Sequence, residues 1–367
     1  MGLKKYKLGE YIERSTANNH SMKYKEDLIV GVTSDGVFSL PKGNVQGVDL
    51  KPYKIVNNGD FVYNPSRFDL GSIAYRTEGL CIVSHLYQIF HLNEKGKEMI
   101  DPIWLFIYLR RNEFRREVTF RNFGSQRPEF NFNDLSDIEL PLPSIEQQRK
   151  YVDVYLALQN NLAAYQSKVE ELKLVCDGYI EELRRKFGAE PIGPYLRSID
   201  VRNNNLLVTL TQGVDVNMQF IPAKREAEDQ EGTKIVRTGQ FAFNKVVKSN
   251  GTKLPIALRE GPDCVISSSY EVFEVVDKEK LLPEYLMLWL SRSETHRQCG
   301  YKSYGTTRDV FPFEDLCKLQ FPIPNIETQK DIANIYKCFI ERKRIAEALK
   351  EQLKNICPVL IRGSLSE

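Results

Sequence analysis

Two short loops combine the residue types that bind phosphate groups. They are Gly124-Ser-Gln-Arg127 and Gly305-Thr-Thr-Arg308. A glycine followed by small hydroxyl or amide residues lets the backbone approach an anion, and the arginine adds a fixed positive charge. These loops therefore predict contacts to the phosphate backbone of a nucleic acid, although an arginine that only holds the turn before the next Asp-Leu pair explains the pattern equally well. The residues predicted to make such contacts are Ser125, Arg127, Thr306 and Arg308.

Other basic residues outside the predicted long helices are candidates for the same contact. Phosphate contacts position a protein on a duplex, while side chains that reach base edges specify the sequence. For each residue alone, a solvated surface charge is the simpler interpretation. These candidates are Lys42, Arg67, Arg121, Lys245, Lys248, Lys253 and Lys302.

Motifs for catalysis are incomplete in this chain. Asn64-Pro-Ser-Arg67 lacks the second proline and the aromatic residue of an amino-methyltransferase motif, and no Gly-x-Gly loop follows a strand. Gly239 to Lys245 has no Ser or Thr after the lysine, as a Walker loop requires. Pro262-Asp263 and Glu271-Val-Phe273 do not complete a nuclease motif. We therefore predict that the chain is not an enzyme and uses no cofactor.

Histidine and cysteine show no metal-binding spacing. The four histidines stand apart from one another, and the seven cysteines form no Cys-x-x-Cys pair. We predict reduced, mostly buried thiols and no metal site.

The bulk composition is that of an ordinary globular protein. The 367 residues are 42% hydrophobic and 27% charged, with a net charge of +2, which neither requires nor excludes a nucleic-acid partner. No apolar run is long enough to span a bilayer, and the N-terminus does not resemble a signal peptide. We therefore expect a cytoplasmic protein with no membrane partner.

The chain contains one unit twice. Lys54-Ile-Val-Asn-Asn-Gly-Asp-Phe-Val-Tyr-Asn64 matches Lys234-Ile-Val-Arg-Thr-Gly-Gln-Phe-Ala-Phe-Asn244 at an offset of 180 positions, and from Pro102 onward the offset is 181. A repeat of this extent predicts two domains of one fold. Other matches in the same order are 8–12 with 192–196, 81–84 with 264–267, 101–105 with 282–286, 124–127 with 305–308, and 141–148 with 322–329.

The two copies differ most in two windows. One window comprises residues 14–52 and 198–232, and the other comprises residues 65–71 and 245–254. A shared scaffold with two variable surfaces indicates two different targets bound in one geometry.

Each copy predicts short strands followed by helices. Apolar runs separated by Gly, Asn and Asp favour strands joined by turns. Asp101 and Pro102 are typical of a helix start, and a Pro-x-Pro segment at the end of each copy favours an extended chain.

Two long helices follow these Pro-x-Pro segments. We predict the first from Ile145 to about Phe187, capped by Ser144, and the second from Ile326 to about Ile361, capped by Asn325. Their apolar residues alternate at spacings of four and three, which is typical of a coiled coil. Antiparallel packing would give a rod of roughly 60 Å with one domain at each end, because each residue adds about 1.5 Å. The apolar residues are Tyr151, Tyr155, Leu158, Leu162, Tyr165, Val169, Leu172, Cys176, Tyr179 and Leu183, then Ile332, Ile335, Phe339, Ala346, Leu349, Leu353, Ile356 and Leu360.

This arrangement resembles the specificity (S) subunit of type I restriction-modification systems. The resemblance covers nearly the whole chain and rests on the paired Gly-Ser/Thr-x-Arg loops, the paired Pro-x-Pro-x-Ile-Glu-x-Gln segments and the long helices. It implies an α+β fold with two pseudo-symmetric mixed α/β target-recognition domains separated by an antiparallel two-helix coiled coil. The implied division is 1–143 (first target-recognition domain), 144–188 (central long helix), 189–324 (second target-recognition domain) and 325–367 (C-terminal long helix).

The resemblance also implies a non-catalytic DNA-recognition subunit. Each domain would read one half of a bipartite site in double-stranded DNA. The paired helices would set the spacing and dock two methyltransferase subunits, and restriction/translocase subunits would join the complex. Residues in the first turns of the long helices are candidates for docking, although the helix dipole alone explains the acidic ones. These candidates are Glu146, Gln148, Glu327 and Gln329.

Two other hypotheses remain consistent with the residues. One is a coiled-coil scaffold that carries two protein-interaction domains and binds no DNA. The other is a methyltransferase or nuclease that acts on its own, which predicts activity from the isolated chain.

Overall fold

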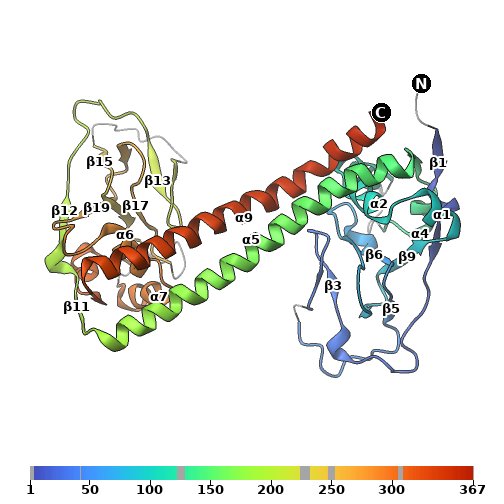
Figure 1. Cartoon of the computed structure of the whole chain (residues 1–367), viewed down its shortest axis with the longest axis horizontal. Coiled ribbons are helices and arrows are strands. Elements are labelled where there is room, and N and C mark those ends of the chain that lie inside the picture. The colour runs from blue at the N-terminus through green and yellow to red at the C-terminus, as the bar shows by residue number, and fades with distance from the viewer. Residues whose placement is uncertain are drawn as a thin grey trace. The chain divides into compact units, whose positions relative to one another are not determined.

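The computed structural model describes residues 4–41, 43–121, 129–223, 232–246, 253–304 and 309–366. It divides into two compact units, unit 1 (residues 1–165 and 345–367) and unit 2 (residues 166–344). Each unit contains one mixed domain and about half of each of the two long helices, α5 (Ile145–Lys186) and α9 (Ile326–Ser366), which are labelled in Figure 1. This arrangement of strands, short helices and two long helices confirms the predicted α+β fold.

Unit 1 is built on a four-stranded antiparallel sheet. Its strand order is β2 (Ile12–Arg14), β9 (Gln88–Leu92), β6 (Phe61–Tyr63) and β7 (Ile73–Tyr75). Three two-stranded sheets accompany it, namely β5 (Lys54–Val56) with β8 (Cys81–Val83), β3 (Gly31–Val32) with β4 (Phe38–Ser39), and β1 (Lys5–Lys7) with β10 (Glu139–Pro141). The helices are α1 (Glu94–Met99), α2 (Pro102–Leu109), α3 (Asn112–Arg121) and α4 (Phe132–Ser136).

Unit 2 repeats the strand topology of unit 1, but its described residues contain no counterpart of α1. The four-stranded sheet has the order β12 (Leu196–Ile199), β19 (Tyr270–Val275), β16 (Phe241–Asn244) and β17 (Ile256–Leu258). The smaller sheets are β15 (Lys234–Val236) with β18 (Cys264–Ile266), β13 (Gln212–Val214) with β14 (Phe220–Pro222), and β11 (Ala189–Pro191) with β20 (Gln320–Pro322). The helices are α6 (Pro283–Leu290), α7 (Ser293–Lys302) and α8 (Phe313–Leu316). The duplication predicted from the sequence is therefore confirmed.

The same aromatic pair lies at the centre of both cores. The rings of Phe61 and Phe90 stack with centroids 4.8 Å apart, and Phe241 and Phe273 stack at the same distance. In each pair the two residues face each other across neighbouring strands. All four side chains are completely buried, so this pair anchors the sheet against the helices of its own unit.

The long helices pack antiparallel within each unit. In unit 1, Gly363 near the end of α9 lies against the ring of Tyr151 near the start of α5, where a Cβ would come within 2.5 Å of a ring carbon. In unit 2, Ile180 and Leu183 near the end of α5 belong to the same buried cluster as Ile332 near the start of α9. The predicted apolar positions are buried or half-buried, with the exception of Tyr179, which is 42% exposed. Its neighbour Ile180 takes the buried position instead.

The second long helix extends beyond its predicted end. Proline is unfavourable inside a helix, yet α9 continues through Pro358 to Ser366. Leu360, Ile361 and Ser364 are all buried in unit 1, so packing offsets the backbone hydrogen bond that proline cannot donate. Across the described part of the chain, no helix has both the length and the apolar character needed to cross a membrane.

Candidate nucleic-acid interface

Six of the predicted phosphate-contact residues lie outside the described residues. They are Lys42, Ser125, Arg127, Lys248, Thr306 and Arg308. The segments on either side of them are described, and these segments show where the two variable windows lie in each unit.

In unit 1, Arg67 is held on a short rigid segment. It ends the 3-10 helix Pro65–Arg67, whose first backbone N–H groups are capped because the Asn64 side chain accepts from the Ser66 N–H at 3.0 Å. The following residues are fixed to α3, since Arg115 Nε donates to the Asp69 carbonyl at 2.6 Å. Arg67 itself is exposed.

Arg67 lies beside a hollow of about 470 Å³ in unit 1. Hydroxyl groups and apolar side chains from the β3–β4 hairpin and its flanks form most of the lining, and Leu70 contributes from the segment after β6. The lining therefore combines residues of both variable windows, 14–52 and 65–71. Such a surface offers both donors and acceptors and apolar contacts, which are the contacts that distinguish base edges.

In unit 2, the three described lysines predicted to contact phosphate lie on α7 or on segments that contact α7 or the residues after it. Lys245 follows β16, and its carbonyl accepts from the Phe311 N–H at 2.8 Å beside a bridge that joins Tyr304 to Val310. Lys253 precedes Leu254, whose backbone N–H donates to Nδ1 of His296 in α7 at 3.2 Å. Lys302 is the last residue of α7. The described residues on either side of the gap after β16 therefore contact α7 and the residues that follow it, and in unit 1 the residues after β6 contact α3.

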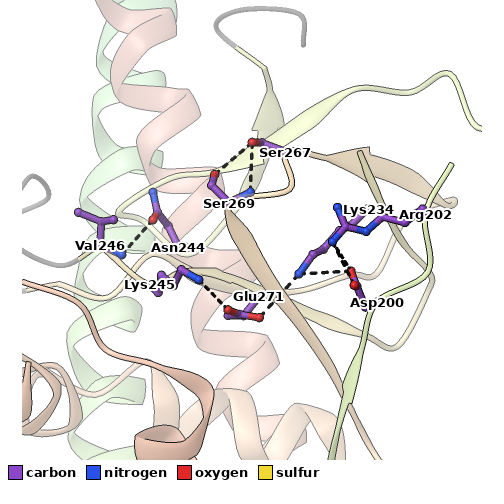
Figure 2. Close-up of polar contacts among 9 residues, drawn as sticks. All are labelled: Asp200, Arg202, Lys234, Asn244, Lys245, Val246, Ser267, Ser269 and Glu271. Atoms are coloured by element: carbon purple, nitrogen blue, oxygen red, sulfur yellow. Dashed lines mark hydrogen bonds and ion pairs between the residues drawn. The ribbon is translucent and has the colours of Figure 1, made fainter. Parts of the chain in front are cut away.

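Charged side chains form a network at one end of the unit 2 sheet (Figure 2). Lys245 Nζ lies 3.0 Å from Glu271 Oε1, and the buried Lys234 Nζ lies 3.7 Å from Glu271 Oε2 and 3.5 Å from Asp200 Oδ1. Arg202 also pairs with Asp200 at 2.8 Å, and this hydrogen bond together with the two cations lowers the pKa of the Asp200 carboxyl. Lys245 is therefore neutralised by Glu271 in the free chain.

Two serines and a backbone turn extend the same region. Figure 2 shows the hydroxyls of Ser267 and Ser269, which are 3.1 Å apart, and the Asn244 side chain, which accepts from the Val246 N–H at 3.0 Å. The Asn244 contact fixes the point at which the chain leaves β16, as Asn64 does after β6.

Unit 1 has different charges on the same scaffold. Lys54 is the counterpart of Lys234, but its Nζ donates to the Tyr87 carbonyl at 2.5 Å and forms no ion pair with any described residue. Gln88 takes the place of Glu271, and its Oε1 is buried without a hydrogen-bond partner among the described residues. Burial, and to a smaller degree Arg14, lowers the pKa of the Lys54 ammonium group. The lysine at this position therefore has no carboxylate partner among the described residues of unit 1, whereas in unit 2 it lies near two carboxylates.

The remaining basic candidates differ in their partners. Arg121 at the end of α3 pairs with Glu117 at 3.0 Å, and such an exposed pair is weak enough to be exchanged for a phosphate. Arg67, Lys253 and Lys302 form no ion pair within the part of the chain that the structure describes.

The predicted docking role of Gln148 and Gln329 is not supported by their positions, because both side chains are completely buried. Gln148 accepts from the Asp101 N–H at 2.8 Å and donates to the carbonyls of Met99 and Pro143, both at 2.9 Å. These contacts join the helix start to the domain, so the glutamine is structural.

Gln329 makes the equivalent three bonds in unit 2. It accepts from the Leu282 N–H at 2.9 Å and donates to the carbonyls of Lys280 and Pro324 at 2.7 and 2.8 Å. Glu146 and Glu327 are exposed beside these glutamines, and Glu327 pairs with Lys330 at 2.9 Å.

Glu271, Asp200 and Lys234 also belong to the candidate interface, although they were not among the predicted site residues. The repeat could have indicated Glu271, because aligning β9 with β19 shows that Glu271 and Gln88 occupy equivalent positions in the two copies. Within the described residues, no group of three or more His, Cys, Asp or Glu side chains is placed to hold a metal ion.

Comparison with known proteins identifies the family. The model of the type I restriction modification DNA specificity domain matches residues 3–174 and again residues 202–355. A putative type I restriction enzyme MjaX specificity subunit from Methanocaldococcus jannaschii is 21% identical over 359 residues, which cover 88% of this chain and 82% of the relative.

A solved structure shows a similar fold. The type I restriction-modification S subunit from M. genitalium matches with a TM-score of 0.68 at 11% identity, covering 100% of this chain and 97% of that chain. The HsdS subunit from Thermoanaerobacter tengcongensis matches with a TM-score of 0.41 at 17% identity, covering 99% and 96% of the two chains. Because the family model covers most of the chain in two separate matches, this protein belongs to the type I restriction-modification DNA specificity family and is a non-catalytic specificity subunit.

Proposed function

We propose that unit 1 and unit 2 each bind one half of a bipartite site in double-stranded DNA, and that the two halves differ in sequence. The observation that carries this proposal is the pairing of one scaffold with two different polar surfaces. Gln88 and Lys54 in unit 1 stand where Glu271 and Lys234 stand in unit 2, on strands of identical register. An amide and a carboxylate differ in charge and in hydrogen-bonding capacity, so the same frame can support different base preferences in the two units.

In this proposal, basic residues fix each domain on the duplex. Arg67 and Arg121 serve unit 1, and Lys245, Lys253 and Lys302 serve unit 2, in addition to the two Gly-Ser/Thr-x-Arg loops. Each contact releases counterions from DNA, so affinity should fall steeply as salt concentration rises.

The long helices supply the spacing and the assembly surface in this proposal. The α5 and α9 helices contain 42 and 41 residues, and each contributes to both units. We propose that they set the distance between the half-sites and dock two methyltransferase subunits, with restriction/translocase subunits joining in the cell. The exposed Glu146 and Glu327 remain the docking candidates at the helix starts.

The test uses the full chain in complex with the methyltransferase encoded in the same host. Methylated positions in DNA exposed to the complex should form a bipartite motif with a fixed gap. Replacing residues 1–143 with the matching domain of a relative should change one half of that motif only. Methylation without sequence preference, or binding that salt does not weaken, would show that the chain is a scaffold and not a DNA reader.

A further inference from the structure

We propose that Phe120 and Tyr301 are a matched pair of DNA-contact residues, one in each unit, whose rings pack against bases or deoxyribose in each half-site. This inference rests on the proposed function and adds a class of contact that the basic residues do not provide. Two independent features support it, namely the exposure of the two rings and the charges beside them.

The first feature is exposure at equivalent positions. Tyr301 is 88% exposed and Phe120 is 81% exposed, which are the two highest values among the large hydrophobic side chains of the described residues. The two residues are 181 positions apart, the offset that relates the two copies in this part of the chain. A single exposed aromatic ring is ordinary on a protein surface. Its recurrence at one position in two diverged copies points to a shared partner.

The exposure of each ring follows from the burial of the opposite face of its helix. In α3, Phe114 and Val118 are buried in unit 1, and Phe120 lies two residues past Val118, on the opposite side of a helix with 3.6 residues per turn. In α7, His296 and Cys299 are buried, and Tyr301 follows Cys299 by the same two residues. Burial of one face of the helix therefore forces each ring into solvent.

The charge beside each ring identifies the partner as an anion-rich one. Arg121 follows Phe120, and Lys302 follows Tyr301, so each exposed ring is joined to an exposed cation. The next residues in the sequence lead into the two Gly-Ser/Thr-x-Arg loops. A cation beside an aromatic ring complements the alternation of phosphate and apolar base or sugar along DNA.

In unit 2 the residues that follow α7 are joined to the end of β16, which carries Lys245 of the charged network. Tyr304, which is 64% exposed, pairs with Val310, and Val310 in turn pairs with Val246 next to Lys245. The end of α7 and the end of β16 therefore belong to one surface. In unit 1 the segment after β6 is fixed to α3 by Arg115, so Arg67 and Phe120 belong to two adjoining segments.

Phe120 and Tyr301 have only the aromatic ring in common, and a ring alone cannot distinguish bases by hydrogen bonding. Phe120 carries no donor, so the contact that both copies share must be apolar packing or partial insertion at a base step. We therefore assign the pair to affinity and DNA deformation, while the variable windows determine the sequence.

The experiment measures DNA binding by the complete methyltransferase complex that contains Phe120→Ala, Tyr301→Ala or both. Each single variant should bind its own target about 5- to 150-fold more weakly, which corresponds to the stacking loss of one base on one ring. The slope of affinity against salt concentration should not change, because no charge is removed. Arg121→Ala provides the contrast, since it should reduce that slope by about one.

Matched controls separate ring contact from general surface effects. Met99→Ala and Val276→Ala remove apolar side chains that are 40% and 56% exposed, and they should bind DNA as the wild type does. Phe120→Tyr and Tyr301→Phe keep the ring and should also retain wild-type affinity. Weak binding by these two variants would overturn the proposal, because the ring would not be the contact.

The outcomes distinguish this inference from the proposed function. If the wild-type complex shows no sequence preference, the proposed function itself fails. If the wild type binds specifically and both alanine variants match their controls, the aromatic contact is wrong and the function stands. If the alanine variants no longer copurify with the methyltransferase, the rings dock a protein subunit and the proposal is overturned.

Discussion

Trp104 Nε1 donates a hydrogen bond to Ser364 Oγ at 3.0 Å, and both side chains are buried although 260 positions separate them in the chain. This bond ties the last turns of α9 to α2 inside unit 1. In unit 2 the position of Trp104 is taken by Tyr285, whose hydroxyl donates to the Pro322 carbonyl at 2.7 Å. The C-terminal turns are therefore part of the first domain.

Removal of the Ser364 hydroxyl should destabilise unit 1. In Ser364→Ala the indole N–H of Trp104 loses its acceptor, so we expect a loss of about 1–3 kcal/mol in the free energy of unfolding. Urea unfolding followed by tryptophan fluorescence would measure it. Ser366→Ala is the control, since Ser366 is exposed and should change the free energy by less than about 0.5 kcal/mol. Equal stability of the two variants would show that the bond does not hold the helix end.

The buried glutamines should be equally important in the two units. Gln148→Leu leaves the Asp101 N–H and two carbonyls without partners, so we expect a loss of about 3 kcal/mol, and the same for Gln329→Leu. Thermal unfolding of each variant would measure this, with the exposed Gln166→Leu as the control. If only one of the two variants lost stability, the hydrogen bonds of the two glutamines would have different roles in the two units.

His296 should make the stability of unit 2 depend on pH. Burial lowers the pKa of its imidazole below 6.5, and Nδ1 must stay unprotonated to accept from the Leu254 N–H. The unfolded chain therefore binds a proton more readily, so this stability is fully present above pH 6.5 and is lost as pH falls through the lower folded pKa. His296→Asn should flatten the dependence of the unfolding temperature on pH between 7 and 5. The exposed His85→Asn should leave it unchanged.

Much of the scaffold could be predicted from the sequence because most elements are represented by two aligned segments, one in each copy. Asp101 and Pro102 start α2 as predicted, since Asp101 accepts from the N–H groups of Ile103 and Trp104. The end of α9 could not be predicted in the same way. Pro358 is a local signal against helix, but the buried contacts of Ile361 that overcome it come from residues far away in the chain.

The candidate interface was harder to predict for a physical reason. Gln148 and Gln329 occupy exposed-looking positions in the first turn of a helix, and only the folded domain reveals the carbonyls that bury them. Lys245 looked like a free cation, whereas Glu271, a strand away, neutralises it. Side-chain pairing across strands depends on register, which composition and motif spacing do not specify.

Glu271 should control the electrostatics of the second half-site. In Glu271→Gln the chain acquires the residue that unit 1 has at this position, Gln88, and the ion pairs to Lys245 and Lys234 are lost. Lys245 then becomes available to a phosphate, so the complex should bind nonspecific DNA more tightly and its salt slope should steepen by about one. A gel-shift series at several salt concentrations would measure both quantities, with the exposed Glu279→Gln as the control. Sequencing of methylated sites should show altered preference in one half of the motif and none in the other. An unchanged motif together with an unchanged slope would mean that Glu271 only supports the fold and faces no DNA.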